Sequence, residues 1–544
     1  MEDAIPSSKM HGLLVFSIIL TIAVLARVQA APVQIPDLSR CQLSSASAPR
    51  GPPLTLYFNC CLPIPKQPMV DFSFHTYTPT VRRVRRPAHT ANAEYIAKIN
   101  KAYQLMRALP DTDGRSFKAQ ADIHCSFCNG GYPQKGFQGD IPLQVHFSWL
   151  FLPWHRWYLY FHERILGSLI GDPSFALVYW NWDDQKTGGN QVPEMFTPAN
   201  TAIYEEKRNK NIQPPVIVPL AASTPLNDSN SVKIDKNLNN MYQSVVTAST
   251  ATLFMGGIVR AGDDLSNASV VNAPLGGGIE NGVHNAIHFY VGDSTTQLSQ
   301  DMGNFATASR DPIFYAHHSN VDRLWEVWRY NLPGGERFDH NDPDFLNAQF
   351  VFYDERGRMV RVLAKDALDS KKLGVYYQKG ESDDLWINYN PPAFTSVSAV
   401  AEALASGVPY IGAAPLNGTI NIGTKFSAIV KRPTEKKPSN SVEVLTIQGL
   451  ETVRDEFVAL LAFVNLPDAG PSTPTHTAEY LGTFNIIAAT GRTKKLMTNV
   501  KYEIGDNLRR IGIQDEDEVV ITLVATKSYP ALTFQGFDID YEDK

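Results

Sequence analysis

The spacing of apolar residues predicts helices in the first two thirds of the chain. Apolar positions recur there at steps of three and four residues, which places them on one helix face, and prolines or glycines stand at the ends of two of the segments. Between residues 187 and 264 this spacing is lost, and we expect long loops. The expected helices are residues 94–109, 153–167, 280–290 and 311–331.

The last part of the chain carries short runs rich in β-branched and aromatic residues between turn residues, a pattern typical of strands. A stretch rich in Pro, Gly and Ala precedes it and ends in the basic run from Lys431 to Pro438, which we interpret as a linker with an exposed protease site. The expected strands are residues 442–447, 480–487, 519–524 and 532–537.

The predicted fold is therefore a mainly α domain followed by a small all-β domain. In the first, four helices form a bundle among long loops; in the second, the strands form a β-sandwich. Pro, Ser and Arg without periodicity at residues 32–90 favour a loop wrapped around the helices. The expected boundaries are a signal peptide at 1–31, a catalytic domain at 32–378, the linker at 379–438 and the β domain at 439–544.

The signal peptide is indicated by an apolar run from Leu13 to Ala26 and small residues after it. This run is shorter than the roughly 20 residues that span a bilayer, so we expect no stable membrane insertion after its removal. It favours the secretory pathway, hence a vacuolar or extracellular protein, with the thylakoid lumen as the alternative. Sequons at Asn227, Asn267 and Asn417 fit a glycoprotein.

Composition excludes some partners. The chain has 544 residues, of which 43% are hydrophobic, 10% aromatic and 19% charged, and its net charge is −6. These values indicate a soluble globular protein without a nucleic-acid partner. The basic run at residues 82–86 is interpreted as a solvated or salt-bridged turn, with an anion site as the alternative.

Five cysteines lie in the first quarter of the chain, where an oxidising lumen permits disulfides. Cys60 and Cys61 are adjacent and are not expected to join each other, because a bridge between neighbours strains the backbone. An odd number also leaves one cysteine over. Disulfides from these positions would pin the N-terminal segment to the core.

The histidines carry the candidate chemistry. His284 and His288 stand four residues apart, so on a helix both imidazoles share a face and can bind one ion. The alternative is a chance pair, but most of the 13 histidines fall in separate apolar segments that the fold can bring together. His162 is expected to lie in the core or behind a ligand. The further candidate ligands are His124, His146, His155, His317 and His318.

Two sites of three imidazoles each suit copper, zinc, iron or nickel better than calcium or magnesium. A zinc peptidase would need a glutamate between the helical histidines, whereas Asn285 and Ala286 stand there. A single zinc ion would also leave the second triad unexplained. Two copper ions close together explain both triads, because together they can deliver two electrons to dioxygen. The aromatic residues near the histidines are mostly core, and a few would line a pocket for a flat aromatic substrate.

The histidine segments resemble those of plant polyphenol oxidases, the tyrosinase and catechol oxidase family, and the likeness covers nearly all of the mature chain. The secretory lead is similar to that of vacuolar members such as aureusidin synthases. By resemblance, one copper ion is held by His124, His146 and His155, the other by His284, His288 and His318, and His317 is a neighbour. The segments that carry the resemblance are His124-Cys125-Ser126-Phe127-Cys128, residues 145–151, residues 154–160, Val283-His284-Asn285-Ala286-Ile287-His288 and residues 311–318.

The resemblance also implies covalent links and pocket residues. It implies a thioether between Cys128 and His146, and disulfides joining Cys41 to Cys61 and Cys60 to Cys125. Glu280, four residues before His284 and hence on the same helical face, would orient a water that deprotonates a phenol. Asn285 would help to hold that water, and Phe305 would gate the site.

The function implied is oxidation of o-diphenols to o-quinones with O₂, with some hydroxylation of monophenols. The β domain would keep the enzyme latent until a protease cuts the linker. Two alternatives remain: a non-catalytic, hemocyanin-like O₂-binding protein, which has the same six-histidine arrangement, and an extracellular protein with structural zinc. Two departures from the family pattern, Asp344-Phe345-Leu346 and Leu460-Leu461-Ala462-Phe463, bear on the packing of the β domain and not on the copper site.

Overall fold

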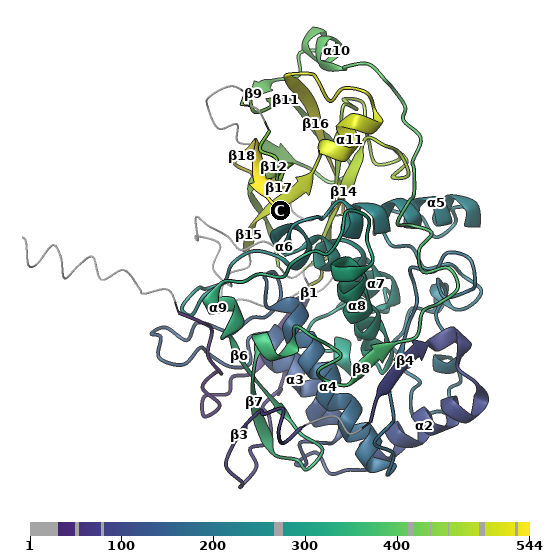
Figure 1. The fold of residues 1–544 in the computed structure, drawn as a ribbon, viewed down its shortest axis with the longest axis vertical. Helices are drawn as coiled ribbons and strands as arrows, with labels where there is room; N and C mark the ends of the chain where they lie inside the picture. Colours follow the sequence, from purple (N-terminus) through teal and green to yellow (C-terminus); the bar gives the residue numbers. More distant parts are fainter. Residues whose placement is uncertain are drawn as a thin grey trace, which may run out of the picture.

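The computed structural model has a mainly helical half with a few small sheets and a C-terminal half built mainly of β-sheets (Figure 1). The expected signal segment, apart from residue 31, and the sequon at Asn267 lie outside the described residues, as does Asn417, whereas Asn227 is exposed. None of the helices in the described part is long and apolar enough to cross a membrane. The structure describes residues 31–48, 54–77, 81–265, 276–411, 418–435, 437–454, 456–488, 495–527 and 531–544.

The helical half contains all four predicted helices and further ones that the apolar spacing did not predict, among them α3. Side-chain caps begin two of the helices: Asn92 accepts a hydrogen bond from the backbone of Tyr95, and Ser116 accepts one from that of Ala119. Helices α4 and α8 pack against each other and are buried along most of their length. The bounds are α2 (Ala93–Arg107), α3 (Phe117–Cys128), α4 (Phe151–Leu169), α7 (Asn285–Val291) and α8 (Ile313–Tyr330).

Two regions expected to be loops contain regular structure. Residues 187–264 hold α5 (Asn230–Met241), a π-helical turn η4 (Tyr242–Val246) and α6 (Ala251–Met255). Ser229 caps α5 by accepting from Val232, but the helix is largely polar and so lacks the apolar spacing on which our expectation rested. The N-terminal wrapping segment includes a hairpin of β1 (Ser44–Ala48) and β2 (Leu54–Phe58), and β3 (Val70–Asp71), which pairs with β7 (Met359–Leu363) beside β6 (Gln349–Tyr353).

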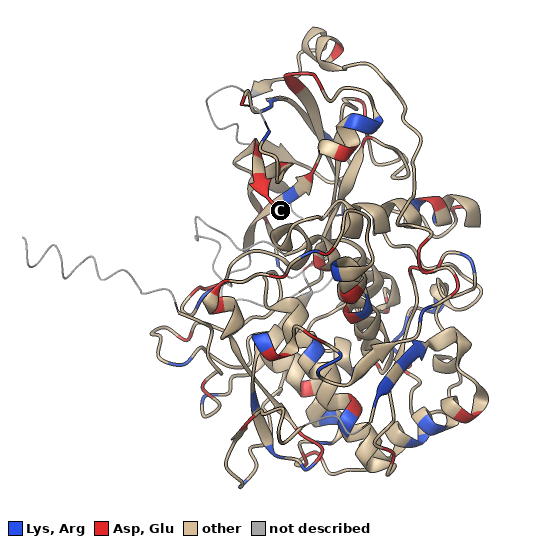
Figure 2. Cartoon of the chain, viewed as in Figure 1, with Lys and Arg blue, Asp and Glu red and all other residues tan. Residues whose placement is uncertain are grey.

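The basic run at residues 82–86 forms a salt-bridged strand and not a turn, with Arg83 and Arg85 buried. Strand β4 (Arg83–Pro87), visible as a blue arrow in Figure 2, lies between β5 (Val178–Tyr179) and β8 (Val375–Tyr377). Arg83 and Arg85 contact the two carboxylate oxygens of Glu163 on α4 at 2.8 and 2.9 Å. Arg85 also contacts Asp322 on α8 at 3.1 Å. Because each buried charge has a partner, this network fixes α4 and α8 relative to each other.

The C-terminal half is built from two five-stranded sheets with the orders β10-β17-β12-β15, with β18 pairing β12, and β14-β13-β16-β11-β9. Phe426 on β11 packs against Phe534 on β17 with ring centroids 5.0 Å apart, so the sheets share an apolar interior. The bounds are β9 (Tyr410–Ile411), β10 (Gly418–Ile420), β11 (Lys425–Lys431), β12 (Ser441–Val453), β13 (Val458–Val464), β14 (Tyr480–Ile486), β15 (Lys495–Glu503), β16 (Glu518–Lys527), β17 (Leu532–Phe534) and β18 (Gly536–Asp543).

The sheets begin inside the range expected to be a linker. Strand β11 pairs with β16 along its whole length and with β9, so β9, β10 and β11 belong to the C-terminal sheets. The range expected to be a linker, 379–438, therefore overlaps three strands, among them the apolar β11. The basic run after Lys431 connects β11 to β12, one strand in each sheet. Residues 379–409 lead from the helical half to the sheets and include α10 (Val400–Ala405), which packs against β16.

Candidate metal centre

The first cluster gathers three histidines from consecutive segments. His124 lies on α3, His155 on the first turns of α4, and His146 in the loop between these helices. All three are buried, with exposed fractions of 0 to 2%. The ring centroids are 5.3 Å apart for His124 and His146, 5.0 Å for His146 and His155, and 5.8 Å for His124 and His155. The structure thus brings together the three residues predicted for one ion.

The second cluster contains His284 at the end of the π-helical turn η5 (Glu280–His284), His288 on α7 and His318 on α8. Their ring centroids lie 4.6, 4.9 and 5.7 Å apart. The Nε2 atoms of His284 and His318 are 3.4 Å apart. A metal about 2.0–2.1 Å from each of two tetrahedral imidazole nitrogens sets those nitrogens roughly 3.3 Å apart, so this spacing matches a shared ion.

The two clusters adjoin each other. The rings of His155 and His318 stack with centroids 4.2 Å apart and planes 9° apart, and those of His146 and His284 are 6.3 Å apart. Helices α4 and α8 carry the stacked pair, and the ion pair between Arg156 and Asp322 joins the same helices one residue from His155 and four from His318. The arrangement is a single centre for two ions rather than two remote sites.

Backbone carbonyls orient four of the six rings. His284 Nδ1 donates to the carbonyl oxygen of Glu280 at 3.3 Å. The Nδ1 groups of His124, His155 and His288 donate to the carbonyl oxygens of Phe305, Phe151 and Met302 at 3.0, 2.8 and 2.7 Å. With the proton on Nδ1, Nε2 keeps its lone pair. The Nε2 atoms of His124 and His155 are buried without a hydrogen-bond partner among the described residues. Buried nitrogens of this kind fit metal ligation.

His317 differs from its neighbour His318. The indole nitrogen of Trp182 donates to Nδ1 of His317 at 3.1 Å, so the proton of the neutral His317 ring lies on Nε2. Neither nitrogen then offers a lone pair to a metal in this form. His317 nevertheless lies within 4.8 Å of the other nitrogens of its cluster, so proximity alone does not separate it from His318. The hydrogen bond from Trp182 favours His318 as the ligand.

Burial keeps all these imidazoles neutral. It lowers the pKa of His124 to about 3 and that of His288 to about 4, and nearby histidines reinforce the shift at His124. Burial, followed by the same mutual repulsion, also lowers the pKa of His146, His155 and His318 well below the ordinary value. Neutral imidazoles are the ligand form that copper and zinc bind, so the donor set fits the metals that the sequence indicates.

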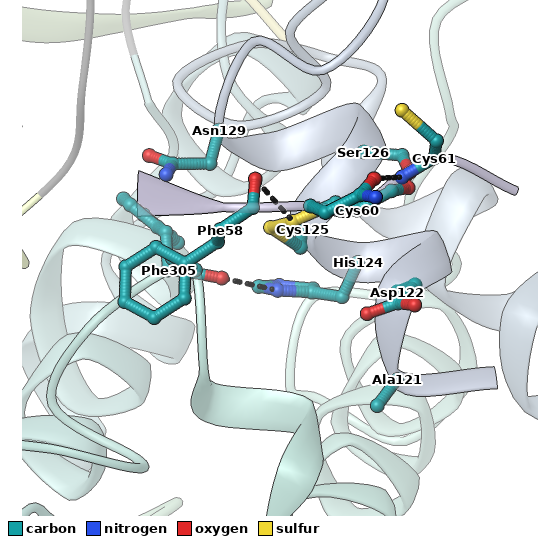
Figure 3. The surroundings of a disulfide bond; sticks show 12 residues. Phe58, Cys60, Cys61, Ala121, Asp122, His124, Cys125, Ser126, Asn129 and Phe305 are labelled. Carbon is teal, nitrogen blue, oxygen red and sulfur yellow. Dashed lines mark hydrogen bonds between the residues drawn. A yellow bond between two sulfur atoms is a disulfide. The ribbon is translucent and has the colours of Figure 1, made fainter. Parts of the chain in front are cut away.

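Cys128, at the end of α3, is the one cysteine outside the disulfides and is buried. Its sulfur lies within 4.8 Å of nitrogens of His124 and His146. The other four cysteines form the implied disulfides, Cys41 with Cys61 and Cys60 with Cys125. Figure 3 shows the second of these beside His124, whose ring points toward the carbonyl group of Phe305. The disulfide thus ties the N-terminal segment to α3 directly beside His124.

Glu280 links the two clusters, but not by sharing a helical face with His284. Residues 280–284 form a π-helical turn broken at Gly282, so the four-residue spacing does not have its α-helical meaning. One carboxylate oxygen of Glu280 accepts from the backbone of Phe147 at 2.8 Å, beside His146, and the other has no partner within the described part of the chain. Burial raises the pKa of Glu280 to about 8.

Asn285 and Phe305 contact the histidines directly. The Oδ1 atom of Asn285 accepts from His284 Nδ1 at 3.0 Å, while its amide nitrogen is engaged by Asn485 of the C-terminal half. The Phe305 ring lies 4.4 Å from the ring of His146 and is buried, with 1% exposed. Both residues therefore lie directly beside histidines of the two clusters.

Sequence reasoning missed several contributors to the centre. Trp182, Met302 and Asn485 each bond a ligand histidine or its neighbour from a distant segment. No local pattern in the sequence connects these residues to the histidines. His162, by contrast, bonds Tyr103 and Gln120 at 3.1 and 3.2 Å and is a core histidine, as one of our two interpretations held.

The comparisons with known proteins agree with this geometry. Three sequence families match successive parts of the chain: "Common central domain of tyrosinase" at residues 114–331, "Polyphenol oxidase middle domain" at 339–392 and "Chloroplastic Polyphenol Oxidase C-terminal domain" at 417–541. The chloroplastic polyphenol oxidase of Malus domestica is 41% identical over 94% of this chain and 85% of the relative. Aureusidin synthase of Antirrhinum majus is 38% identical over 95% and 90%.

Solved structures show the same fold. A latent aurone synthase, a polyphenol oxidase, superposes with a TM-score of 0.82 at 34% identity and covers 94% of this chain and 99% of its own. An active aurone synthase with a copper B site superposes with a TM-score of 0.59 at 41% identity, covering 64% of this chain and all of its own.

The helical core and the paired histidine clusters define a protein of the tyrosinase class, in which imidazoles hold two copper ions. The chain belongs to the plant polyphenol oxidase family, as its identity to these relatives over nearly its whole length shows. The relatives are named as oxidases or synthases, and none of these findings supports a non-catalytic oxygen carrier.

Proposed function

We propose that the six histidines form the centre at which this chain, a type-3 copper enzyme, oxidises o-diphenols to o-quinones with O₂. His124, His146 and His155 would hold one copper ion, and His284, His288 and His318 the other. The observation that carries this assignment is the stacking of His155 on His318 at 4.2 Å between two clusters of buried, neutral imidazoles. Bound copper supplies the electron transfer between the phenol and dioxygen.

The protein side chains prepare this site. Carbonyl groups hold four imidazole rings with Nε2 turned away from the backbone, so little reorganisation accompanies metal binding. Burial excludes bulk water, which strengthens the electrostatic interactions within the centre. The ring of Phe305 lies against His146 and would limit which phenols approach, consistent with the gating role that the family resemblance implies.

We propose that the centre also hydroxylates some monophenols. The unpartnered oxygen of Glu280 can accept a hydrogen bond from a water, and its raised pKa suits proton transfer near neutral pH. Asn285 could help hold this water only when its amide nitrogen leaves Asn485, to which it is bonded in this structure.

Cys128 would join His146 through a thioether, detectable by mass spectrometry as a linked pair of peptides lighter by two hydrogen atoms.

The C-terminal half would keep the enzyme latent until a protease cuts the chain. Strand β14 contacts η5 and α7, which carry two of the histidines, and Figure 1 shows β14 reaching toward these helices. A cut between Lys431 and Pro438 would leave β11 paired with β16, so cleavage in residues 379–409 is the better candidate for release. The latent relative matches 94% of this chain and the active one 64%.

We also propose that the chain enters the secretory route and is glycosylated at the exposed Asn227.

The test is a substrate panel on copper-loaded protein cleaved in residues 379–409. Quinone formation from 4-methylcatechol, raised by cleavage, is the expected result. Hydroxylation of tyramine would support the monophenol activity, and its absence would confine the enzyme to diphenols. Failure to turn over any catechol, with two copper ions bound per chain, would reject the proposed function in favour of an oxygen carrier.

A further inference from the structure

The helical segment that carries His284 and His288 is broken two residues before His284. Gly282 has the non-helical dihedral angles φ −88° and ψ −108°, and its carbonyl accepts from the backbone N–H of Asn285. A Cβ atom at this position would lie 2.4 Å from Ser244 Oγ, so a larger residue would displace the Ser244 side chain. The same carbonyl accepts a second hydrogen bond from the other half of the molecule: Asn485 Nδ2 donates to Gly282 O at 3.0 Å.

A second hydrogen bond runs in the opposite direction. The amide nitrogen of Asn285 donates to the main-chain oxygen of Asn485 at 2.7 Å. The two asparagines therefore form a reciprocal pair, each side chain bonding the backbone of the opposite segment. Both are fully buried, so water does not compete for these groups.

This pair determines how the amide of Asn285 is turned. The carbonyl of Asn485 accepts only a donor, so the NH₂ group of Asn285 must face it, and Oδ1 must face His284. Turned the other way, the NH₂ group would meet the N–H of His284 and the oxygen would meet a carbonyl. The orientation imposed by Asn485 thus gives His284 Nδ1 a second acceptor beside Glu280 O, which lies 3.3 Å from it, and together they keep the proton on Nδ1 and leave Nε2 for a metal.

We propose that Asn485 is a positioning residue of the metal centre, acting on His284 through Gly282 and Asn285. The inference rests on the proposed function, because it assigns His284 to the second copper ion. Asn485 lies on β14, and Ala488, just beyond the end of this strand, reaches the first cluster. Ala488 O accepts from the backbone N–H of Phe305 at 3.4 Å, and Phe305 O accepts from His124. Removing the C-terminal half would then change the hydrogen bonding of both clusters as well as uncover them.

The test compares two asparagine-to-alanine variants of the full-length chain. Asn485→Ala removes the bond to Gly282 and loosens the carbonyl that holds Asn285. Asn239→Ala is the matched control: this buried amide on α5 also crosses between the two halves, to Thr475 O and Thr477 O at 2.7 and 3.1 Å, but does not contact the ligands. We expect a chelator to remove one copper ion about ten times faster from Asn485→Ala than from the wild type, and at the wild-type rate from Asn239→Ala. Loss of a residue that hydrogen-bonds a metal ligand typically weakens metal binding by about 10- to 100-fold, and our expectation takes the lower value.

A second measurement needs no metal. In the copper-free protein, amide hydrogen exchange of residues 280–288 should accelerate in Asn485→Ala and stay at the wild-type rate in Asn239→Ala. If Asn485→Ala does not fold, Asn485→Leu, which is close to asparagine in size and carries no donor, should give the same acceleration. Equal exchange and equal copper release in the two alanine variants would overturn the proposal and leave simple covering of the centre. Wild-type protein that binds no copper would instead reject the proposed function, while the exchange experiment would still test the positioning role.

Discussion

Loss of the disulfide between Cys60 and Cys125 should weaken both the fold and the hold on the first copper ion. The bridge closes a loop of 65 residues. The chain-entropy relation for such a loop gives about 4 kcal/mol of stability, from restriction of the unfolded chain. Cys125 directly follows His124 on α3, so the Cys60→Ala/Cys125→Ala variant also removes the tether next to a ligand.

The second disulfide supplies the control. Cys41 and Cys61 close a loop of 20 residues, for which the same relation gives about 3 kcal/mol, but neither residue adjoins a histidine of the centre. Removing either bridge should therefore lower the free energy of unfolding by a similar amount. Only the loss of Cys60–Cys125 should in addition speed copper release.

Denaturant unfolding of the copper-free variants, followed by tryptophan fluorescence, measures the stability change, and release of copper to a chelator measures the hold on the metal. The two assays separate a global from a local effect. Equal copper release from both double variants would refute the claim that the bridge positions α3. Unchanged unfolding midpoints would refute the entropic magnitude.

Three further predictions concern ligands, proton transfer and pH. His318→Ala should retain one copper ion per chain and His317→Ala two, as metal analysis will show; the reverse would exchange their roles. Glu280→Gln should lower the rate on tyramine by at least about 100-fold and the rate on 4-methylcatechol far less; equal losses would deny it a role specific to monophenols. Burial holds the pKa of the six histidines below their ordinary value of 6.5. The unfolded chain therefore binds more protons than the folded chain below that pH, and the folded state loses stability as the pH falls. Copper-free protein should thus unfold at a lower urea concentration at about pH 5 than at about pH 7. Equal midpoints would contradict this.

The sequence predicted most reliably the elements that bury one face and the site residues that stand in short motifs. The helices at α2, α4 and α8 have apolar faces or terminal punctuation, and the strands at β12, β14, β16 and β17 were also expected. Helix α3 was not predicted because every residue in it except Lys118 is buried, which leaves no contrast between faces. Strand β13 was missed for the same reason: it is an unbroken apolar run buried on both sides.

The residues of the candidate site likewise fall into those that local motifs predict and those that only the fold brings in. The ligand histidines stand in short motifs, and His284 and His288 could be paired from their spacing alone. The residues that orient them come from remote segments: Trp182 lies 135 residues from His317, and Asn485 lies 200 residues from Asn285. Only the folded topology brings such partners together. The break at Gly282 likewise depends on packing against Ser244, and it changed the expected relation between Glu280 and His284.

Anomalous diffraction at the copper absorption edge tests the central claim most directly, because it locates the metal without reference to activity. We predict two copper peaks side by side, one among His124, His146 and His155 and the other among His284, His288 and His318. A single peak, two peaks in separate parts of the molecule, or a metal bound through His317 in place of His318 would contradict the account.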